Sequence, residues 1–325
     1  MSVEVVKGGL ADTFQDGGRF GHQHLGINPN GAMDLTAMQV ANALVGNEFN
    51  EAVLEMCFPA SVLVFKQPAL IALSGANFCA ELNGTPVPIN QAIAATAGSE
   101  LKFTKMEKGT FCYLAVGGGF SLLTWLGSGS TNTKAKAGGW KGRSLHKGDV
   151  IELKKNASGV TNTKIFPWRA NVFDFYSDAN NIQFVRGPEF DWLDESSQEK
   201  LMEESFAVTS LRDRMGYRLK GEKLIRKNEE LVSTSVTFGT VQLLPDGQLI
   251  ILMADHQTTG GYPRVAQVIA ADRSKLVQTG VGDTICFREV SLQEAEDLLL
   301  TQAKILKQIQ VTCQVRLKDF FNSVR

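Results

Sequence analysis

The sequence predicts a mainly β protein with a few helices. Short apolar runs rich in Val, Ile, Leu and Phe follow one another between Ser61 and Lys155, and glycine, proline and asparagine separate them. The same pattern returns in the second half, in the runs LIILMA, RVAQVIAA and DTICF. Evenly spaced short strands of this kind are typical of a closed or nearly closed β-barrel.

The two strand-rich halves predict two similar barrels. Each half closes with Gly-Asp ahead of an apolar strand, at Asp149 in LHKGDVIEL and at Asp283 in GVGDTICF. The polar stretch KNASGVTNTK, residues 155–164, is the predicted linker. We therefore expect a first domain over residues 1–155 and a second over residues 165–310.

Three segments carry helical signals. Apolar residues at helical spacing in DLTAMQVANALVGN predict a helix with Asp34 as N-cap and Gly46 as stop. The capping box SSQE, from Ser196, predicts a less regular helix, and the capping box SLQE predicts a C-terminal helix with an apolar stripe. Residues 311–325 form a tail, whose alternating apolar residues from Val311 predict an edge strand or a partner-paired strand.

Composition indicates a globular protein with a substantial core. Hydrophobic residues make up 43% and charged residues 21% of the 325 residues. The formal net charge of −1 offers no basic field for nucleic acid or an anionic membrane. The N-terminus lacks the apolar region of a signal peptide, and no apolar run approaches the length of a membrane span. We expect a cytoplasmic protein.

Several common types of site are missing from the sequence. There is no phosphate-binding P-loop, no dinucleotide fingerprint and no nucleophile elbow. The five cysteines are scattered among apolar residues, which predicts free thiols in a reducing compartment rather than disulfides or a zinc site. His22 and His24 are two residues apart in a loop, and His146 and His256 stand alone, so we expect no metal.

Four polar stretches are candidate sites, because each combines charged residues with glycines that allow close backbone approach. They are TFQDGGRFGHQHLG, NPNGAMD, SLRDRMGYRLKG and DHQTTGGYPR. Each also has a structural interpretation: Asp16 and Arg19 form a turn ion pair, Asp34 only caps a helix, or Gly260 only turns a hairpin. Singly, the structural interpretation is favoured by about two to one, but four such clusters favour a shared polar cleft.

Long motifs extend these stretches, in a fixed order from Gly9 to Arg288. They include TFQDGGRFGHQHLGINPNGAMDLTAMQVANALVGN, GGWKGRSLHKGD, VRGPEF, DRMGYRLKG and GTVQLLPDGQLIILMADHQTTGGYPRVAQVI. In these motifs the chain resembles the biotin-dependent carboxyltransferase family. That family includes the KipI-antagonist (KipA) proteins, the C subunit of 5-oxoprolinase and allophanate hydrolase subunit 2. The resemblance implies two cyclophilin-like β-barrel domains, and it does not extend to the C-terminal helix and tail.

The resemblance implies a subunit of an ATP-dependent 5-oxoprolinase, which opens 5-oxo-L-proline to L-glutamate. It implies two partners, a KipI-like subunit and a LamB/YcsF-like subunit, with which ATP would be shared. Two alternatives stay open: a biotin-dependent carboxyltransferase of the urea carboxylase type, and a non-catalytic antagonist of a KipI-like kinase inhibitor. Biotin belongs only to the first alternative, carried by another protein, because the chain has no Met-Lys-Met motif. Gly129 stands where the family commonly has an arginine.

ATP-coupled lactam opening requires groups that hold a carboxylate, phosphate oxygens and a developing oxyanion. We expect the arginines to bind anions, the aspartates to orient them or polarise a water, and the other polar side chains to donate hydrogen bonds. The predicted catalytic residues are Asp16, Asp34, Arg214 and Tyr217. The predicted substrate-binding residues are Arg19, Asn30, Gln257, Thr258, Thr259, Gly260, Tyr262 and Arg264. Gln257, Thr258 and Tyr262 are predicted to face the same cleft as Arg214 and Tyr217.

Overall fold

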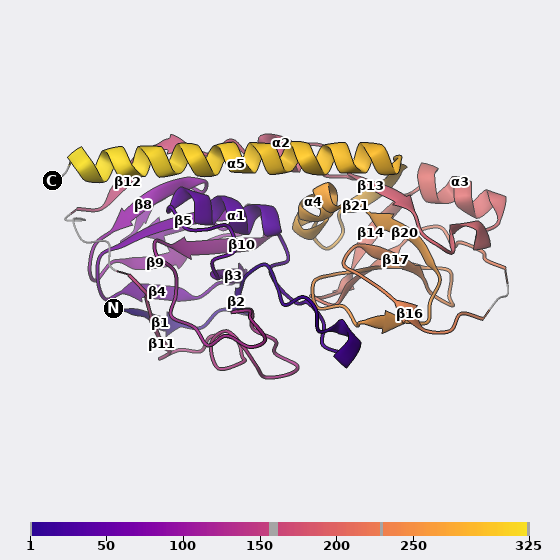
Figure 1. Cartoon of the computed structure of the whole chain (residues 1–325), viewed down its shortest axis with the longest axis horizontal. Helices are drawn as coiled ribbons and strands as arrows, with labels where there is room; N and C mark the ends of the chain where they lie inside the picture. Colours follow the sequence, from indigo (N-terminus) through magenta and orange to yellow (C-terminus); the bar gives the residue numbers. More distant parts are fainter. Residues whose placement is uncertain (1, 156–161, 228–229, 324–325) are drawn as a thin grey trace. The chain divides into compact units, whose positions relative to one another are not determined.

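The computed structural model describes residues 2–155, 162–227 and 230–323 (Figure 1). The described chain separates into two compact units, and each is assembled from segments distant in sequence. Unit 1 contains Met1–Arg19, Asp34–Val172 and Lys304–Arg325, whereas unit 2 contains Phe20–Met33 and Phe173–Ala303.

Unit 1 extends past the expected domain end at residue 155. Its strand β12 (Lys164–Arg169) pairs with β8 (Gln91–Ala95), so the chain completes a sheet of unit 1 before it enters unit 2. Most of the predicted linker, residues 156–161, lies outside the described residues.

The described part of unit 1 contains two six-stranded antiparallel sheets. The first sheet has the order β11 (Val150–Glu152), β1 (Ser2–Lys7), β4 (Val62–Phe65), β9 (Glu100–Phe103), β6 (Ala80–Leu82), β7 (Thr85–Pro86). The second sheet has the order β12, β8, β5 (Ala69–Asn77), β10 (Lys108–Val116), β3 (Val53–Cys57), β2 (Thr13–Gln15). The strands predicted from the apolar runs between Ser61 and Lys155 are confirmed.

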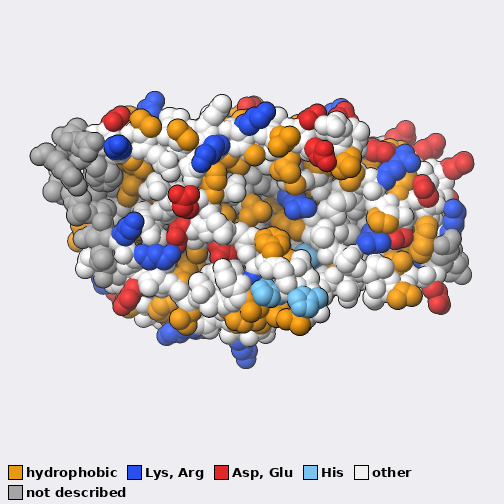
Figure 2. Space-filling view, in the orientation of Figure 1, with side chains coloured by type: hydrophobic (Ala, Val, Ile, Leu, Met, Phe, Trp, Pro, Cys, Tyr) orange, Lys and Arg blue, Asp and Glu red, His pale blue; other side chains and the backbone are white. Residues whose placement is uncertain are grey.

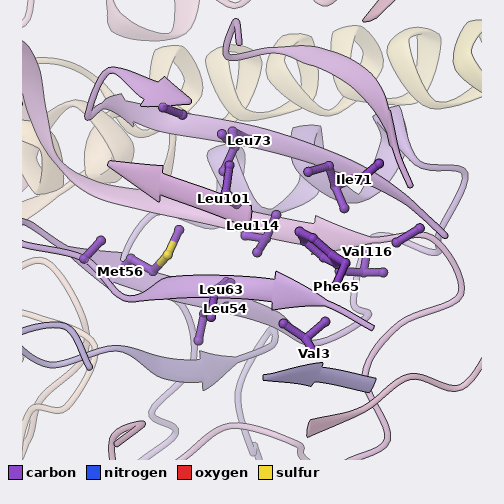
Figure 3. Close-up of a cluster of buried hydrophobic side chains, with 14 of the residues drawn as sticks. Val3, Leu54, Met56, Leu63, Phe65, Ile71, Leu73, Leu101, Leu114 and Val116 are labelled. Atoms are coloured by element: carbon purple, nitrogen blue, oxygen red, sulfur yellow. The ribbon is translucent and has the colours of Figure 1, made fainter. Parts of the chain in front are cut away.

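The two sheets of unit 1 share one apolar core (Figure 3). Phe65 and Leu101 come from the first sheet, and Leu54 and Leu114 from the second, and each is at most 1% exposed. The buried positions alternate with half-buried ones along β4, as the period of two in a strand requires. Burying each such side chain contributes about 1.5–3 kcal/mol relative to leaving it in water.

Helix α1 (Leu35–Leu44) packs on β5 and β10 of unit 1 (Figure 1). Its N-cap is Asp34, whose Oδ1 accepts the N–H of Ala37 at 2.9 Å. The chain leaves the helix at Gly46, where φ is 75°, a left-handed conformation that glycine adopts without steric cost. The predicted cap and stop are both confirmed.

Unit 2 contains a closed barrel of seven strands in its described part. The strand order is β13 (Asn181–Arg186), β20 (Arg264–Val268), β17 (Thr240–Leu243), β18 (Leu249–Leu252), β15 (Gly216–Lys220), β14 (Ser205–Arg212), β21 (Thr284–Glu289). Strand β21 closes the barrel through a parallel pairing with β13, and the other pairings are antiparallel. A short ribbon joins β16 (Thr234–Ser235) to β19 (Thr259–Gly260). The mainly β fold is confirmed.

Unit 2 also contains three short helices: α2 (Phe173–Tyr176), α3 (Glu195–Glu203) and α4 (Arg273–Gln278). Helix α3 is capped by Asp194, whose Oδ1 accepts the N–H of Ser197 at 2.8 Å. The capping box predicted from Ser196 is therefore wrong by two residues. The helix begins at Glu195, so Ser196 lies within its first turn rather than ahead of it. The Ser197 hydroxyl accepts the N–H of Ile225 at 2.8 Å.

Helix α5 (Leu292–Ser323) begins at the predicted SLQE capping box. The N–H of Ser291 donates to Oε2 of Glu294 at 2.8 Å, and the N–H of Glu294 donates to Oγ of Ser291 at 3.2 Å. The helix continues through the segment where a separate tail with a strand was predicted, and that prediction is wrong. Its buried residues are spaced by three or four, as on one helical face: Leu306, Gln310, Cys313 and Leu317.

The charged side chains do not segregate by sign on the face drawn in Figure 2, where basic and acidic groups are interspersed. This distribution accords with a formal net charge of −1. Among the described residues, no helix combines the length and the apolar character that crossing a membrane would require.

Candidate functional site

In unit 2, predicted site residues gather around the carboxylate of Asp255. The Arg214 guanidinium donates from Nε to Oδ2 at 3.0 Å and from Nη2 to Oδ1 at 2.9 Å. The Asn30 amide also donates to Oδ1 of Asp255, and Nη2 of Arg214 donates to the carbonyl of Gly31 at 2.6 Å. One network thus joins the segment Phe20–Met33 to the two loops that carry Arg214 and Asp255.

Strand pairing places Arg214 opposite Asp255. Strands β15 and β18 are hydrogen-bonded neighbours, and their ladder continues past the strand ends. The N–H of Met253 donates to the carbonyl of Met215 at 2.9 Å, and the N–H of Asp255 donates to the carbonyl of Arg214 at 2.7 Å. The two charged side chains therefore meet because the backbone register brings them to the same end of the barrel.

Arg264 also has an internal carboxylate partner. Its Nε and Nη2 donate to the two carboxylate oxygens of Glu189 at 2.9 and 2.8 Å, and its Nη1 donates to the carbonyl of Ser235 at 3.0 Å. Burial alone would raise the pKa of Glu189, but the hydrogen bonds from Arg264 hold it below its ordinary value. The structure thus pairs the Arg264 guanidinium with Glu189, as it pairs Arg214 with Asp255, and their predicted site roles stay predictions.

Tyr217 lies in the barrel core. It is 1% exposed, and its hydroxyl donates to the carbonyl of Val277 at 3.2 Å. Tyr217 is an inward-facing residue of β15, which alternation in a short strand with glycine at its start does not reveal. Its predicted catalytic role, and the prediction that it faces the same cleft as Gln257, stay predictions.

The DHQTTGGYPR stretch forms one edge of the β16–β19 ribbon. Gly260 is buried there, and a Cβ on it would lie 2.6 Å from Nε2 of Gln242, so the Gln242 amide would have to shift to admit a side chain. Gln257 and Thr258 are half-buried, and Thr259 and Tyr262 are exposed. These four side chains therefore still present groups that a ligand can reach, and their role in substrate binding stays a prediction.

His256, in the same stretch, is a buried histidine that sequence reasoning treated only as an isolated residue. It is 2% exposed, and its Nδ1 lies 2.6 Å from the carbonyl oxygen of Gln257. Burial lowers the pKa of His256, and the positive charge of Arg273 lowers it further. A neutral ring that donates from Nδ1 to this carbonyl carries a lone pair on Nε2, the form that accepts a proton. In the sequence, the apolar run LIILMA shortly before His256 was the available signal that this histidine is buried.

In unit 1, Asp16 organises the loop over residues 128–130. Its Oδ1 accepts the hydroxyls of Ser128 and Ser130 at 2.7 and 2.6 Å, and its Oδ2 accepts the N–H of Gly129 at 2.6 Å. The N–H of Gly18 donates to Oδ1 at 2.8 Å. With 5% exposure, this carboxylate holds the loop together, and its predicted catalytic role stays a prediction. Gly129, the departure from the family pattern, contributes its N–H to that loop.

Arg19 and Asp34 are also interior residues of unit 1. The Arg19 side chain is 1% exposed, donates to the carbonyl of Ser130 and stacks 4.8 Å from the ring of Trp125. Asp34 caps α1, and its own N–H donates to the hydroxyl of Tyr113 at 2.7 Å. Asp34 therefore serves as a helix cap and Arg19 binds its own loop, and their predicted roles in catalysis and substrate binding stay predictions.

Comparison with known proteins identifies the family of this chain. A family model described as the carboxyltransferase domain, subdomain A and B, matches residues 25–289. The chain belongs to this family. The predicted resemblance is confirmed, and the matched range includes the Asn30, Arg214 and Asp255 network and the ribbon of β16 and β19.

Relatives of this carboxyltransferase chain include two proteins named as the C subunit of 5-oxoprolinase. The protein from Escherichia coli (strain K12) is 35% identical over 311 residues, which are 94% of this chain and 97% of the relative. The one from Haemophilus influenzae is 37% identical over 299 residues, which are 92% of this chain and 94% of the relative. The Kluyveromyces lactis urea carboxylase structure has a TM-score of 0.87 at 27% identity, covering 95% of this chain and 29% of that one.

Metal binding finds no support within the described ranges, because they hold no group of three His, Cys, Asp or Glu side chains that could bind an ion. The polar site residues lie in two groups, one in each unit. Unit 2 brings Asn30, Arg214 and Asp255 together, with His256 next in sequence. Unit 1 brings Asp16 and Arg19 to the loop over residues 128–130.

Proposed function

We propose that this chain is a subunit of an enzyme that opens the lactam of 5-oxo-L-proline to L-glutamate with hydrolysis of ATP. One observation carries the proposal: two relatives named as the C subunit of 5-oxoprolinase match over 94% and 92% of this chain and over 97% and 94% of their own length. A match of that extent includes most of both units. The urea carboxylase from Kluyveromyces lactis, by contrast, is matched over 29% of its length.

The chemistry of a lactam determines what the site must do. Amide resonance makes water slow to open the ring, and phosphorylation by ATP would make the carbonyl carbon electrophilic. The protein must then bind a substrate carboxylate, hold a developing oxyanion and accept a proton from water. Gln257 and Tyr262 carry accessible hydrogen-bond donors for the first two tasks. The Nε2 atom of neutral His256 is suited to accept the proton.

The arginines of unit 2 differ in how readily they can bind the phosphates of ATP or the carboxylate of a substrate. Arg214 donates two hydrogen bonds to Asp255, and Arg264 donates two to Glu189, so both guanidinium groups already bind a carboxylate of this chain. Arg273 has no such carboxylate within the described residues and is the guanidinium best suited to a ligand anion. A shared ATP site would accordingly draw on Arg273 in this chain.

The proposed enzyme has several subunits. The relatives are named as one lettered subunit of 5-oxoprolinase, which supports a complex with other chains. We propose a KipI-like and a LamB/YcsF-like subunit as the partners and expect this chain to have no turnover alone.

The experiment is reconstitution of the complex of all three subunits and measurement of ATP hydrolysis that depends on 5-oxo-L-proline. We expect turnover only in the complete complex, and none when urea replaces 5-oxo-L-proline. His256→Asn should lower kcat by about 100-fold or more, as expected for loss of a proton acceptor. The matched control is His146→Asn, because His146 is exposed, and it should leave kcat unchanged. Absence of turnover in the complete complex contradicts the proposal.

A second candidate function is carboxyl transfer to or from biotin. The TM-score of 0.87 to the urea carboxylase from Kluyveromyces lactis favours it, since the same fold serves in that protein. Free biotin, titrated into the chain and followed by calorimetry, separates the two functions. Biotin binding that His256→Asn and Tyr262→Phe weaken would support carboxyl transfer, whereas the 5-oxoprolinase proposal expects no biotin binding. An antagonist of a KipI-like protein would keep partner binding in both variants and show no turnover.

A further inference from the structure

Arg273, the first residue of α4, carries a charge that the described residues do not compensate. Its Nε is shielded from solvent and has no hydrogen-bond acceptor, and no carboxylate in the described part of the chain forms an ion pair with it. Burial lowers the pKa of the guanidinium, and no negative neighbour offsets that effect. The residue as a whole is half-buried rather than fully buried.

The carboxylate next to Arg273 in sequence already has other partners. Asp272 forms an ion pair with Nζ of Lys275 at 2.9 Å and accepts the N–H of Gln183 at 2.8 Å. Asp255, whose charge acts on His256 as that of Arg273 does, is bound by Arg214 through a two-point ion pair. Within the described residues, Lys275 and Arg214 thus each have a carboxylate partner, whereas Arg273 has none.

An aromatic ring holds the Arg273 guanidinium in place. Its Cζ lies 5.2 Å from the ring centroid of Phe238, a cation–π distance. His256 is near enough for the charge of Arg273 to act on it. A guanidinium stacked on one face presents its N–H groups at the edge, and that fork matches the two oxygens of a carboxylate or phosphoryl group.

We propose that Arg273 binds an oxyanion of a small ligand, with Phe238 orienting the guanidinium. A buried charge without a partner is costly, and a ligand oxyanion would supply the missing negative charge. The inference deepens the proposed function and rests on it for the two sources of the anion. These sources are the carboxylate of 5-oxo-L-proline and the phosphoryl oxygens of a nucleotide.

Calorimetric titration of the full chain, without partner subunits, tests the site. The probes are inorganic phosphate and 5-oxo-L-proline, each at constant ionic strength because salt screens exposed charges. We expect one of the two to bind, which identifies the source. Arg273→Met should weaken that binding by more than tenfold, and Arg273→Lys should weaken it less, because lysine keeps the charge and loses the fork.

A matched control is Arg186→Met. Arg186 also stacks on a ring, at 4.3 Å from Phe190, but it has a two-point ion pair with Glu289 at 2.7 and 3.1 Å. This variant should bind the anion as the unmodified chain does. The melting temperature without ligand distinguishes a binding role of Arg273 from a structural one. Arg273→Met should be at least as stable as the unmodified chain, because it removes an uncompensated charge, whereas loss of a structural residue would lower the melting temperature.

Three results would overturn the proposal. They are binding of neither anion to the unmodified chain, unchanged binding in Arg273→Met, and loss of stability in Arg273→Met without any anion binding. The binding measurement requires neither turnover nor partners. Failure of the 5-oxoprolinase proposal in the reconstituted complex is therefore distinguishable from failure of the anion site.

Discussion

Arg214 and Asp255 form a two-point ion pair in unit 2, and the same Asp255 carboxylate accepts the Asn30 amide. Both side chains are mostly buried, at 20% and 15% exposure. Arg214→Met leaves this carboxylate without its cation and removes the bond to the Gly31 carbonyl. We expect the free energy of unfolding to fall by about 2–4 kcal/mol.

A double-mutant cycle in chemical denaturation measures this contact. With Asp255→Asn as the second change, the coupling should be about 1–3 kcal/mol. Arg218→Met is the control, because Arg218 pairs with the exposed Asp246 on the same barrel and its loss should change stability little. Equal losses in the two arginine variants would contradict a special role for Asp255.

Asp16→Asn should loosen the loop over residues 128–130. The carboxylate accepts four hydrogen bonds there, and an amide in its place turns an N–H group toward at least one of the same donors. We expect a loss of about 2–3 kcal/mol in the free energy of unfolding and faster amide hydrogen exchange at Gly129.

Asp213→Asn is the matched control for that variant. Oδ1 of Asp213 accepts the N–H groups of Met215 and Gly216 in an exposed turn, and asparagine retains this oxygen. Its stability should change little. Unchanged hydrogen exchange at Gly129 in Asp16→Asn would show that the loop is held by other contacts.

The two adjacent glycines of the β19 turn should respond differently to alanine. A Cβ at Gly260 would lie 2.6 Å from Nε2 of Gln242, a buried side chain that donates to the carbonyl of Tyr262 at 3.2 Å. A Cβ at Gly261 meets Oγ of Ser233 at 3.4 Å, an ordinary contact. Gly260→Ala should cost about 1–3 kcal/mol of unfolding free energy, as overpacking does, and Gly261→Ala should cost little. Equal melting temperatures of the two variants would refute this interpretation.

Asp12 should make stability depend on pH. Burial raises the pKa of this carboxyl from 3.8 to about 6, against hydrogen bonds from Ser61 that lower it. Between about pH 4 and pH 6 the folded chain retains a proton that the unfolded chain releases, so stability falls as pH rises through this window and is level above it. The change amounts to roughly 3 kcal/mol.

Asp12→Asn tests this dependence. Denaturant unfolding from pH 4 to pH 7 should show the slope in the unmodified chain and a flat profile over the same window in the variant. The variant should also be less stable at every pH, because an amide N–H group meets the N–H of Ser61 or Cys57. A slope that persists in the variant would assign the titration to another group.

The secondary structure was largely predictable because its signals are local. The apolar runs became strands, and Asp34, Gly46 and the SLQE box became a cap, a stop and a helix start. The tail after residue 310 was misassigned because its alternating apolar residues fit a period of two. In the helix, Val311 and Val315 are 47% and 55% exposed, whereas Cys313 and Leu317 are buried. Packing of one helical face decided between the two periods.

The candidate site was predictable only in part, because charge compensation is not a local property. The prediction singled out Arg214 and Arg264, which have two-point carboxylate partners, and it passed over Arg273, which has none within the described residues. Asp272 precedes Arg273 in sequence, but its carboxylate pairs with Lys275, two residues beyond the arginine. His256 was passed over although the apolar run LIILMA before it signalled burial, and the cation that acts on it, Arg273, is distant in sequence.

By itself the sequence determined the mainly β class, the caps of α1 and α5 and the family to which the chain belongs, since turn residues, caps and long motifs are each contained in a contiguous stretch. Only the tertiary structure decided which charges are neutralised. Arg214 finds Asp255 across 41 residues of chain, and Arg264 finds Glu189 across 75. Such pairings follow from strand register and barrel closure, and the burial that makes a charge costly exists only once those strands have met.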